Sequence, residues 1–240
     1  MKSHMKLSDD EFDRLPVERR KSILAGYMHY GYAYDETPET NLRWAERFLR
    51  YYPGSSGARL IQAKAYQQMG EKEKAVHILE DVLQNAEDIN SITYLRACQD
   101  LADMGRLEEA EKYLSELVRV FPRYIEARFY LGKLKVMLEK KEEAISIFRS
   151  LLEEYPKGAG VKLELGKLLL EKGEYAEAEN LLLSAADTLK IQPEPFRWLS
   201  ELYIRQKKWK SARKMLELYK KYEGEIEVYR DLSRKIPGSS

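Results

Sequence analysis

One alanine recurs along this chain at intervals of 34 or 35 residues, and this spacing constrains the fold more than any other feature. MGEKEKAVHILEDVL from Met69, MGRLEEAEKYLSELV from Met104 and KGEYAEAENLLLSAA from Lys172 share glycine, alanine five residues later and leucine four after that. Segments from Leu138 and Arg205 keep this frame without the glycine. The alanines are Ala75, Ala110, Ala144, Ala178 and Ala212, and their partner hydrophobes are Leu79, Leu114, Phe148, Leu182 and Leu216.

A second small residue lies twelve positions before each alanine. Small residues on two adjacent segments allow two helices to approach closely where they cross. Apolar residues also recur at helical spacing on both sides of the turn, so each unit is predicted to be a helical hairpin. Glycine suits the end of a first arm, and proline ends second arms by removing a backbone donor. The small residues are Ala63, Cys98, Gly132, Gly166 and Ser200, and the prolines are Pro53, Pro122 and Pro156.

This combination of slots resembles the tetratricopeptide repeat, a unit of 34 residues built from two antiparallel helices. The resemblance covers Ser56 to about Tyr222. It implies an all-α fold, a right-handed α-solenoid of about six such units with capping helices. The turn glycine is missing at Glu139 and Lys207, and the terminating proline is missing at Glu87 and Lys190. We expect these departures to alter only local helix ends.

The frame also divides the chain. Residues 1–21 hold a remnant of a tag, a short leading helix with a Ser8–Glu11 capping box, and the start of a longer helix. The solenoid covers 22–224, with units near 22–55, 56–90, 91–124, 125–158, 159–192 and 193–224. Residues 225–240 form a capping helix and tail, with Ile226, Tyr229, Leu232 and Ile236 along one side. No linker rich in Gly, Pro or Ser separates these units, so one continuous solenoid is expected.

Composition narrows the environment and the partners. The 41 basic and 40 acidic residues leave a net charge of +1, which argues against nucleic acid or membrane as a globally attracted partner. No stretch approaches the length of a membrane span, and the only cysteine, Cys98, excludes an intrachain disulfide. We expect a cytoplasmic protein. SHM at residues 3–5 and the final GSS resemble cloning sequence, so the natural start is expected at Met5, with a removed export signal as the alternative.

The motifs of common enzymes are missing from the sequence. His29 and His77 lie in different units without metal-binding spacing, and Cys98 occupies a small-residue slot where it should be buried and inert. Nucleotide-binding glycine loops and the GxSxG motif do not occur. We therefore expect a non-enzyme without cofactor or metal.

Binding is the remaining function. The family resemblance implies that first arms line a concave groove for a protein or peptide partner, with two residues per arm pointing into it. An apolar row flanked by lysines suits a segment with hydrophobic anchors and acidic residues. In the alternative, the apolar row packs between neighbouring arms and the lysines are only solvated. The candidates are Leu60, Lys64, Leu95, Gln99, Phe129, Lys133, Leu163 and Lys167, followed in the last unit by Arg197 and Glu201.

A basic segment provides an alternative function, the binding of nucleic acid or an anionic surface. It surrounds one tryptophan and is followed by two more lysines, although acidic residues lie nearby. A solvated helix with the tryptophan packed on the terminal helix is the competing interpretation. The segment comprises Arg205, Lys207, Lys208, Trp209, Lys210, Arg213 and Lys214.

The tyrosine-rich segment GYMHYGYAYDETPET falls in the atypical first unit, where His29 replaces the small residue. Tyr30 and Tyr34 are expected either to seal the N-terminal end or to form an aromatic wall of the groove. Self-association through the solenoid ends or this unit is also open, because exposed repeat ends can pair with copies of themselves.

Overall fold

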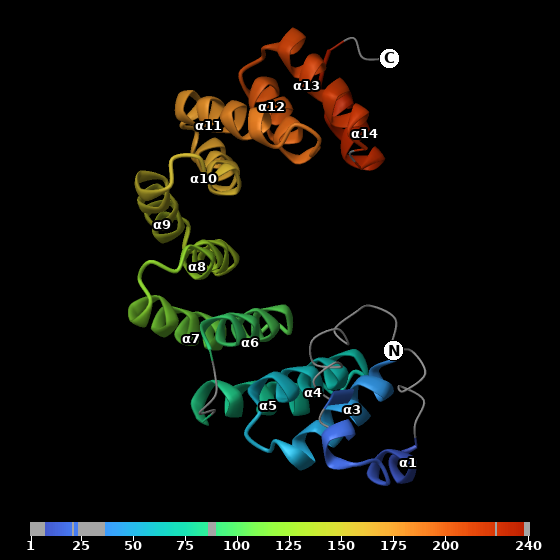
Figure 1. Cartoon of the computed structure of the whole chain (residues 1–240). Helices are drawn as coiled ribbons and strands as arrows, with labels where there is room; N and C mark the ends of the chain where they lie inside the picture. Colours follow the sequence, from blue (N-terminus) through green and yellow to red (C-terminus); the bar gives the residue numbers. More distant parts are fainter. Residues whose placement is uncertain (1–7, 21, 24–36, 86–89, 224, 238–240) are drawn as a thin grey trace. The chain divides into compact units, whose positions relative to one another are not determined.

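The computed structural model describes residues 8–20, 22–23, 37–85, 90–223 and 225–237. In these ranges the chain folds into helices joined by short turns (Figure 1). Contacts between helices divide the chain into two units, Met1–Phe121 and Pro122–Ser240. The division falls at the end of a second arm, directly before Pro122. Each unit is described separately below.

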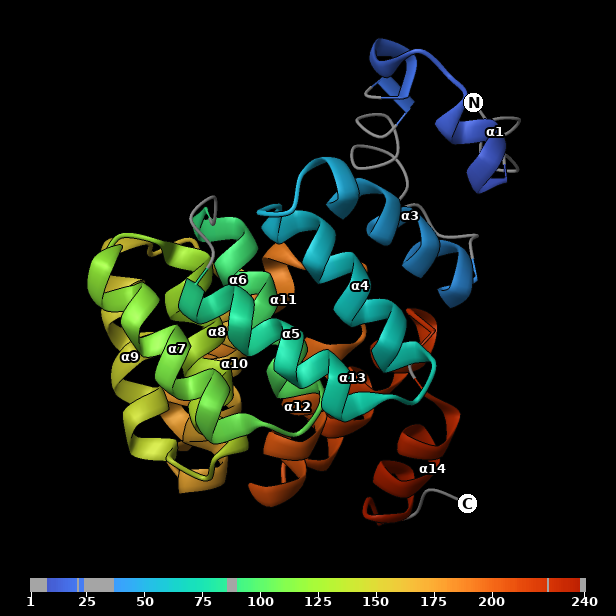
Figure 2. The same ribbon diagram turned by 90° about the horizontal axis from the view of Figure 1, so that it is seen from below.

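Unit 1 stacks helices that are consecutive in sequence, and α3, α4 and α5 lie alongside one another in Figure 2. In addition to consecutive pairs, the first arms α4 and α6 contact each other directly. Its helices are α1 (Asp9–Asp13), α3 (Pro38–Tyr51), α4 (Ser56–Gln68), α5 (Lys72–Asn85), α6 (Ser91–Asp103) and α7 (Leu107–Val120).

Unit 2 contains three hairpins and a terminal helix. The first arms α8, α10 and α12 lie on one side and the second arms α9, α11 and α13 on the other (Figure 1). The helices are α8 (Ile125–Met137), α9 (Lys141–Glu154), α10 (Ala159–Lys172), α11 (Tyr175–Thr188), α12 (Glu194–Arg205), α13 (Trp209–Lys221) and α14 (Ile226–Arg234).

The repeated small residues allow the two arms of each hairpin to cross closely. A Cβ atom on Gly132 would lie only 2.4 Å from Cε1 of Phe148, and one on Gly166 would lie 2.8 Å from Cγ of Leu182. In the last hairpin the small residue is Ser200, whose hydroxyl donates to the carbonyl oxygen of Ala212 at 3.4 Å. All five frame alanines are fully buried, as the repeat predicted.

The turns between arms share one backbone conformation even where glycine is missing. Gly70, Gly105 and Gly173 have φ of 84–86°, and Glu139 and Lys207 occupy the corresponding turns with φ of 58°. A left-handed residue lets the chain reverse after a first arm, and glycine adopts that conformation at the lowest cost. The hairpin geometry therefore overrides the local preference of Glu139 and Lys207.

Both ends of the described chain carry packed caps. The predicted capping box is present: the hydroxyl of Ser8 accepts from the Glu11 amide at 3.3 Å, and the Glu11 carboxylate accepts from the Ser8 amide at 2.8 Å. Phe12 on α1 is fully buried against Trp44, with the ring centroids 5.7 Å apart.

At the other end of the chain, the apolar side predicted for the terminal helix is only partly correct. Leu232 and Ile236 are buried, whereas Ile226 is 62% exposed. Ile226 begins α14, and its side chain therefore adds nothing to the core of unit 2.

The prediction of an all-α fold of packed helix hairpins is confirmed. Strands are absent from the described residues, and consecutive helices pack against one another within each unit. None of the helices in the described ranges is long and apolar enough to cross a membrane.

Candidate functional site

The first apolar series on the first arms lies mostly inside the protein. Leu60, Leu95 and Leu163 are buried, so their side chains pack within the helix stack, as in the alternative that the sequence left open. Phe129 is only half-buried, and its ring lies over Gly160 on the next first arm, where an added Cβ would be 3.7 Å from Cζ. Among the apolar candidates with a described structure, Phe129 therefore offers the most surface to a partner.

The lysines of the second series differ in their pairing. Lys64 lies 3.7 Å from the carboxylate of Asp100, and Lys167 lies 3.0 Å from that of Glu164. Lys133 is exposed and has no ion-pair partner among the described residues. Gln99, the uncharged member of the series, is half-buried on α6. The charges of Lys64 and Lys167 are therefore neutralised by carboxylates, whereas the charge of Lys133 is not.

Several of these charged side chains lie around Trp198 on α12. The ammonium of Lys167 lies 5.3 Å from the Trp198 ring centroid, and the guanidinium carbon of Arg197 lies 5.1 Å from it. The indole nitrogen donates to a carboxylate oxygen of Glu194 at 3.4 Å, and the same oxygen is 3.2 Å from Lys167. Burial opposes the charged form of Lys167, but Glu164 and Glu194 outweigh it and raise its pKa. Lys167 is therefore a cation held in place by neighbouring carboxylates.

A pocket of about 470 Å³ lies between α12 and the terminal helix α14 in unit 2. Apolar side chains of Trp198, Val228 and Leu232 line part of it. The charged lining residues are Glu171, Arg197, Glu201, Arg205, Glu227, Asp231 and Lys235. The pocket is therefore more highly charged than most small-molecule sites, which are lined mainly by apolar side chains.

Most charges in this α12–α14 pocket are already paired. Glu201 accepts from Arg205 at 3.1 Å and lies 3.7 Å from Lys235, which is also 3.2 Å from Asp231. Arg197, by contrast, lies over the Trp198 ring and has no carboxylate partner within the described ranges. Its guanidinium is therefore available to an acidic group of a ligand.

Sequence reasoning placed Arg197 and Glu201 on this face and expected a capping helix after residue 224. It did not predict that Trp198 and Val228 would line a pocket with them. The sequence could have indicated Trp198, because it directly follows the predicted groove residue Arg197. The contribution of Val228 depends on how α14 folds back, which the repeat frame does not determine.

The predicted basic patch is divided between paired and free side chains. Arg205 binds Glu201 and the carbonyl oxygen of Leu170, Lys208 lies 3.4 Å from Glu179, and Arg213 donates to the carbonyl oxygen of Pro237. Trp209 is half-buried against the core of unit 2. The exposed lysines, Lys207, Lys210 and Lys214, have no ion-pair partner among the residues that the structure describes.

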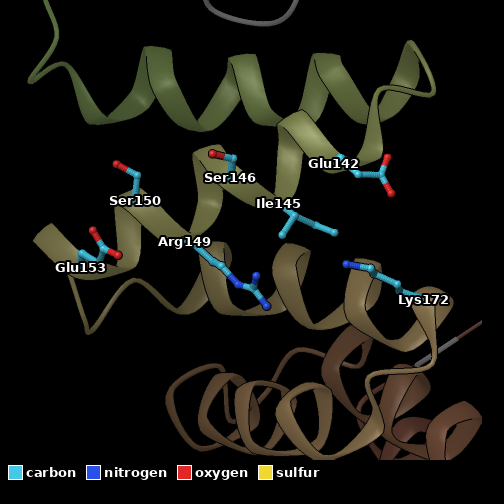
Figure 3. A pocket seen from close by; sticks show the side chains of 7 residues that line it. All are labelled: Glu142, Ile145, Ser146, Arg149, Ser150, Glu153 and Lys172. Atoms are coloured by element: carbon cyan, nitrogen blue, oxygen red, sulfur yellow. The ribbon is translucent and has the colours of Figure 1, made fainter.

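A second hollow, of about 490 Å³, lies along the outer helix α9 (Figure 3). Glu142 and Glu153 stand near its two ends, and Arg149 and Lys172 extend into it. Arg149 is 2.9 Å from Glu177, and Lys172 is 2.9 Å from Glu174, so both cations are paired with α11 or the turn before it. Glu142 and Glu153 have no such partner in the described structure.

Groups suited to catalysis are not assembled in the described part of the chain. Cys98 is fully buried in its small-residue slot, and burial raises its thiol pKa to about 12, which disfavours the nucleophilic thiolate. Three or more metal-binding side chains do not come together among the described residues. Tyr30 and Tyr34 lie outside the described ranges, so their predicted roles stay predictions.

Comparisons with known proteins agree with this architecture. Tetratricopeptide repeat models match residues 95–159 and 139–194, and a model described as anaphase-promoting complex, cyclosome, subunit 3 matches residues 39–117. No curated protein matches the chain by sequence.

Solved structures of low sequence identity share the fold. The pilF protein of Pseudomonas aeruginosa is 19% identical with a TM-score of 0.68, covering 89% of this chain and 95% of that one. YrrB, described as a TPR protein with an unusual peptide-binding site, is 14% identical with a TM-score of 0.59, covering 79% and 97%. MamA of Desulfovibrio magneticus is 14% identical with a TM-score of 0.56, covering 73% and 96%. Together with the family models, which span residues 39 to 194, the helix hairpins show that the chain belongs to the tetratricopeptide repeat proteins.

Proposed function

We propose that this chain is a non-catalytic interaction scaffold that binds a peptide or partner segment on its first-arm face. The observation that carries the proposal is the α12–α14 pocket, where apolar surface lies beside the unpaired guanidinium of Arg197. Peptide binding by the similarly folded YrrB gives the proposal additional support. Catalysis has no comparable support, because the one buried thiol is held in its unreactive form.

The pocket also indicates the chemistry of the segment. An apolar side chain can contact Trp198 and Val228, and a neighbouring carboxylate can pair with Arg197, because a charge-assisted pair is strongest where one partner is not already neutralised. Lys133 and Phe129 lie on the first arm α8 of the same unit and extend the face with a free cation and an aromatic ring. We therefore expect segments in which apolar and acidic residues alternate or adjoin.

Selection of random peptides displayed on phage against the full chain tests this proposal. Selected peptides should combine an apolar residue with an acidic one, and Arg197→Glu should weaken their binding by about tenfold or more, the equivalent of roughly 1.4 kcal/mol. Lys157→Glu, a charge reversal on an exposed side chain in the turn between α9 and α10, is the matched control and should leave binding unchanged. Peptides that bind Arg197→Glu and wild type equally well would remove the α12–α14 pocket from the proposal. Loss of binding in Lys133→Glu but not Arg197→Glu would move the site to α8.

A further inference from the structure

Charge is unevenly distributed among the outer helices of unit 2. α13 has five basic side chains and one acidic one, whereas α9 has two basic and four acidic, and α11 has three acidic and no basic. The near-zero net charge of the chain therefore conceals a basic helix at one edge of this outer layer and acidic helices toward the other. The basic residues of α13 are Lys210, Arg213, Lys214, Lys220 and Lys221.

The outward face of α13 is mainly cationic, and its one carboxylate, Glu217, accepts a hydrogen bond from the Tyr229 hydroxyl at 3.0 Å. Ala212, Leu216 and Tyr219 form its buried face. Lys210, Lys214 and Lys221 lie on the opposite side at helical spacing and are exposed. Lys210 and Lys221, near the two ends of this helix, have no ion-pair partner in the described structure.

The outward face of α9 has the opposite character. Glu142 and Glu153 lie near its two ends beside the 490 Å³ hollow, both exposed and both without an ion-pair partner among the described residues. On α11, between α9 and α13, Leu183 leaves 42% of its surface exposed. The outer layer thus presents free carboxylates, an exposed leucine and free lysines in spatial order across three helices.

We propose that two copies of this chain associate through the outer faces of unit 2. They are related by a two-fold axis that lies over α11 and runs parallel to it. A two-fold rotation places α13 of each copy opposite α9 of the other, so a surface with opposite charges at its two edges is complementary to itself. Lys210 and Lys221, which are eleven residues apart as Glu142 and Glu153 are, then pair with those two carboxylates of the second copy. Leu183 lies near the axis. Charge pairs at an exposed interface fix its register and are weakened by salt.

Nucleic acid is the competing occupant of the lysine stripe. It is less favoured because the aromatic ring of the patch, Trp209, packs against the core of unit 2 and is not free to stack on a base. The lysines would then have to act through phosphate contacts alone, whereas the acidic face on α9 supplies a partner of matching charge within the same protein.

Sedimentation equilibrium of the full chain tests the proposal. At a protein concentration of about 100 µM and about 50 mM salt we expect a dimer, and at about 500 mM salt its dissociation constant should rise at least tenfold, because screening then acts within a few ångströms. The double variants Lys210→Glu/Lys221→Glu and Glu142→Lys/Glu153→Lys should each be monomeric at low salt. Both sets of side chains are exposed, and circular dichroism should show both variants folded.

Mixing the two monomeric variants gives the decisive result. In the mixed pair, reversed α13 faces reversed α9 and unchanged α13 faces unchanged α9, so both contacts are attractive and a heterodimer should form. Lys133→Glu, on the first-arm face, is the control and should dimerise like the wild type. A monomeric wild type at low salt, a dimer that survives both reversals, or a mixture that stays monomeric would overturn the proposal. Binding of short duplex DNA by a monomeric wild type, lost in Lys210→Glu/Lys221→Glu, would overturn it in favour of nucleic acid.

Discussion

Gly132→Ala tests the close helix crossing on which the whole repeat depends. The new methyl carbon would lie 2.4 Å from Cε1 and 2.7 Å from Cζ of Phe148, about 1 Å closer than a normal carbon contact. Phe148 is fully buried, so its ring cannot relieve the clash by moving into solvent. Overpacking of this kind costs about 1–3 kcal/mol. The gain in helix propensity from glycine to alanine is about 1 kcal/mol in the opposite direction.

The clash should outweigh the propensity, and we expect a net loss of up to about 2 kcal/mol in the free energy of unfolding. Gly160→Ala is the matched control on the next first arm, because its added Cβ would be 3.7 Å from Phe129 Cζ, an ordinary contact. This control should be neutral or stabilise by up to about 1 kcal/mol. Urea unfolding followed by far-ultraviolet circular dichroism measures both values.

A double-mutant cycle identifies the cause. Phe148→Leu removes the ring that the new methyl would meet, so Gly132→Ala should cost less in that background than in the wild type. An equal cost in both backgrounds would show that the penalty does not come from Phe148. If Gly132→Ala unfolds at the same urea concentration as the wild type, or a higher one, the reasoning from the close crossing is wrong.

Four further predictions concern other parts of the fold. Glu139→Gly or Lys207→Gly should each raise the free energy of unfolding by about 0.5–1 kcal/mol in urea titrations, because glycine tolerates the left-handed φ of 58°. Phe12→Ala should undock α1, seen as faster hydrogen exchange of the α1 amides with unit 2 unaffected. Cys98 should react with a disulfide reagent at pH 8 only on unfolding, because its pKa is about 12 and its side chain is buried. Burial raises the pKa of Asp100 against the opposing effect of Lys64, so the folded state holds that proton more tightly than the unfolded state. Stability from this group should therefore increase as pH falls through the raised pKa toward 3.8, and Asp100→Asn should flatten this slope in denaturation measured against pH.

The 34-residue frame was sufficient to predict the fold. It located the frame alanines and the small residues opposite them, because both are fixed by the distance between two crossing helices and neither tolerates a larger side chain. It also predicted the first-arm positions, but not which of them reach solvent. Leu95 and Phe129 occupy the same slot, yet Leu95 is buried and Phe129 is only half-buried beside Gly160, a neighbour that lies 31 residues further along the chain.

Ion pairing on the candidate surface could not be predicted for a related reason. Lys64, Lys133 and Lys167 occupy equivalent positions in the repeat, so the frame predicts the same role for all three. Lys64 is paired with Asp100 and Lys167 with Glu194, residues of the following hairpin, whereas Lys133 has no such partner in the described structure. The state of each lysine thus depends on the neighbouring unit rather than on its own.

The positions that the frame leaves undetermined are those that distinguish one hairpin from another. Burial of the frame alanine and its partner hydrophobe is the same from Ala75 to Ala212, so these residues determine architecture and little else. By contrast, the outward residues change from carboxylates on α9 to lysines on α13 while the helices keep the same place in their hairpins. Because these side chains are exposed, substituting them does not change how the helices pack. It changes instead which partners the surface attracts or repels. A segregated charge pattern on an otherwise regular repeat is therefore better explained by a binding partner than by the requirements of folding.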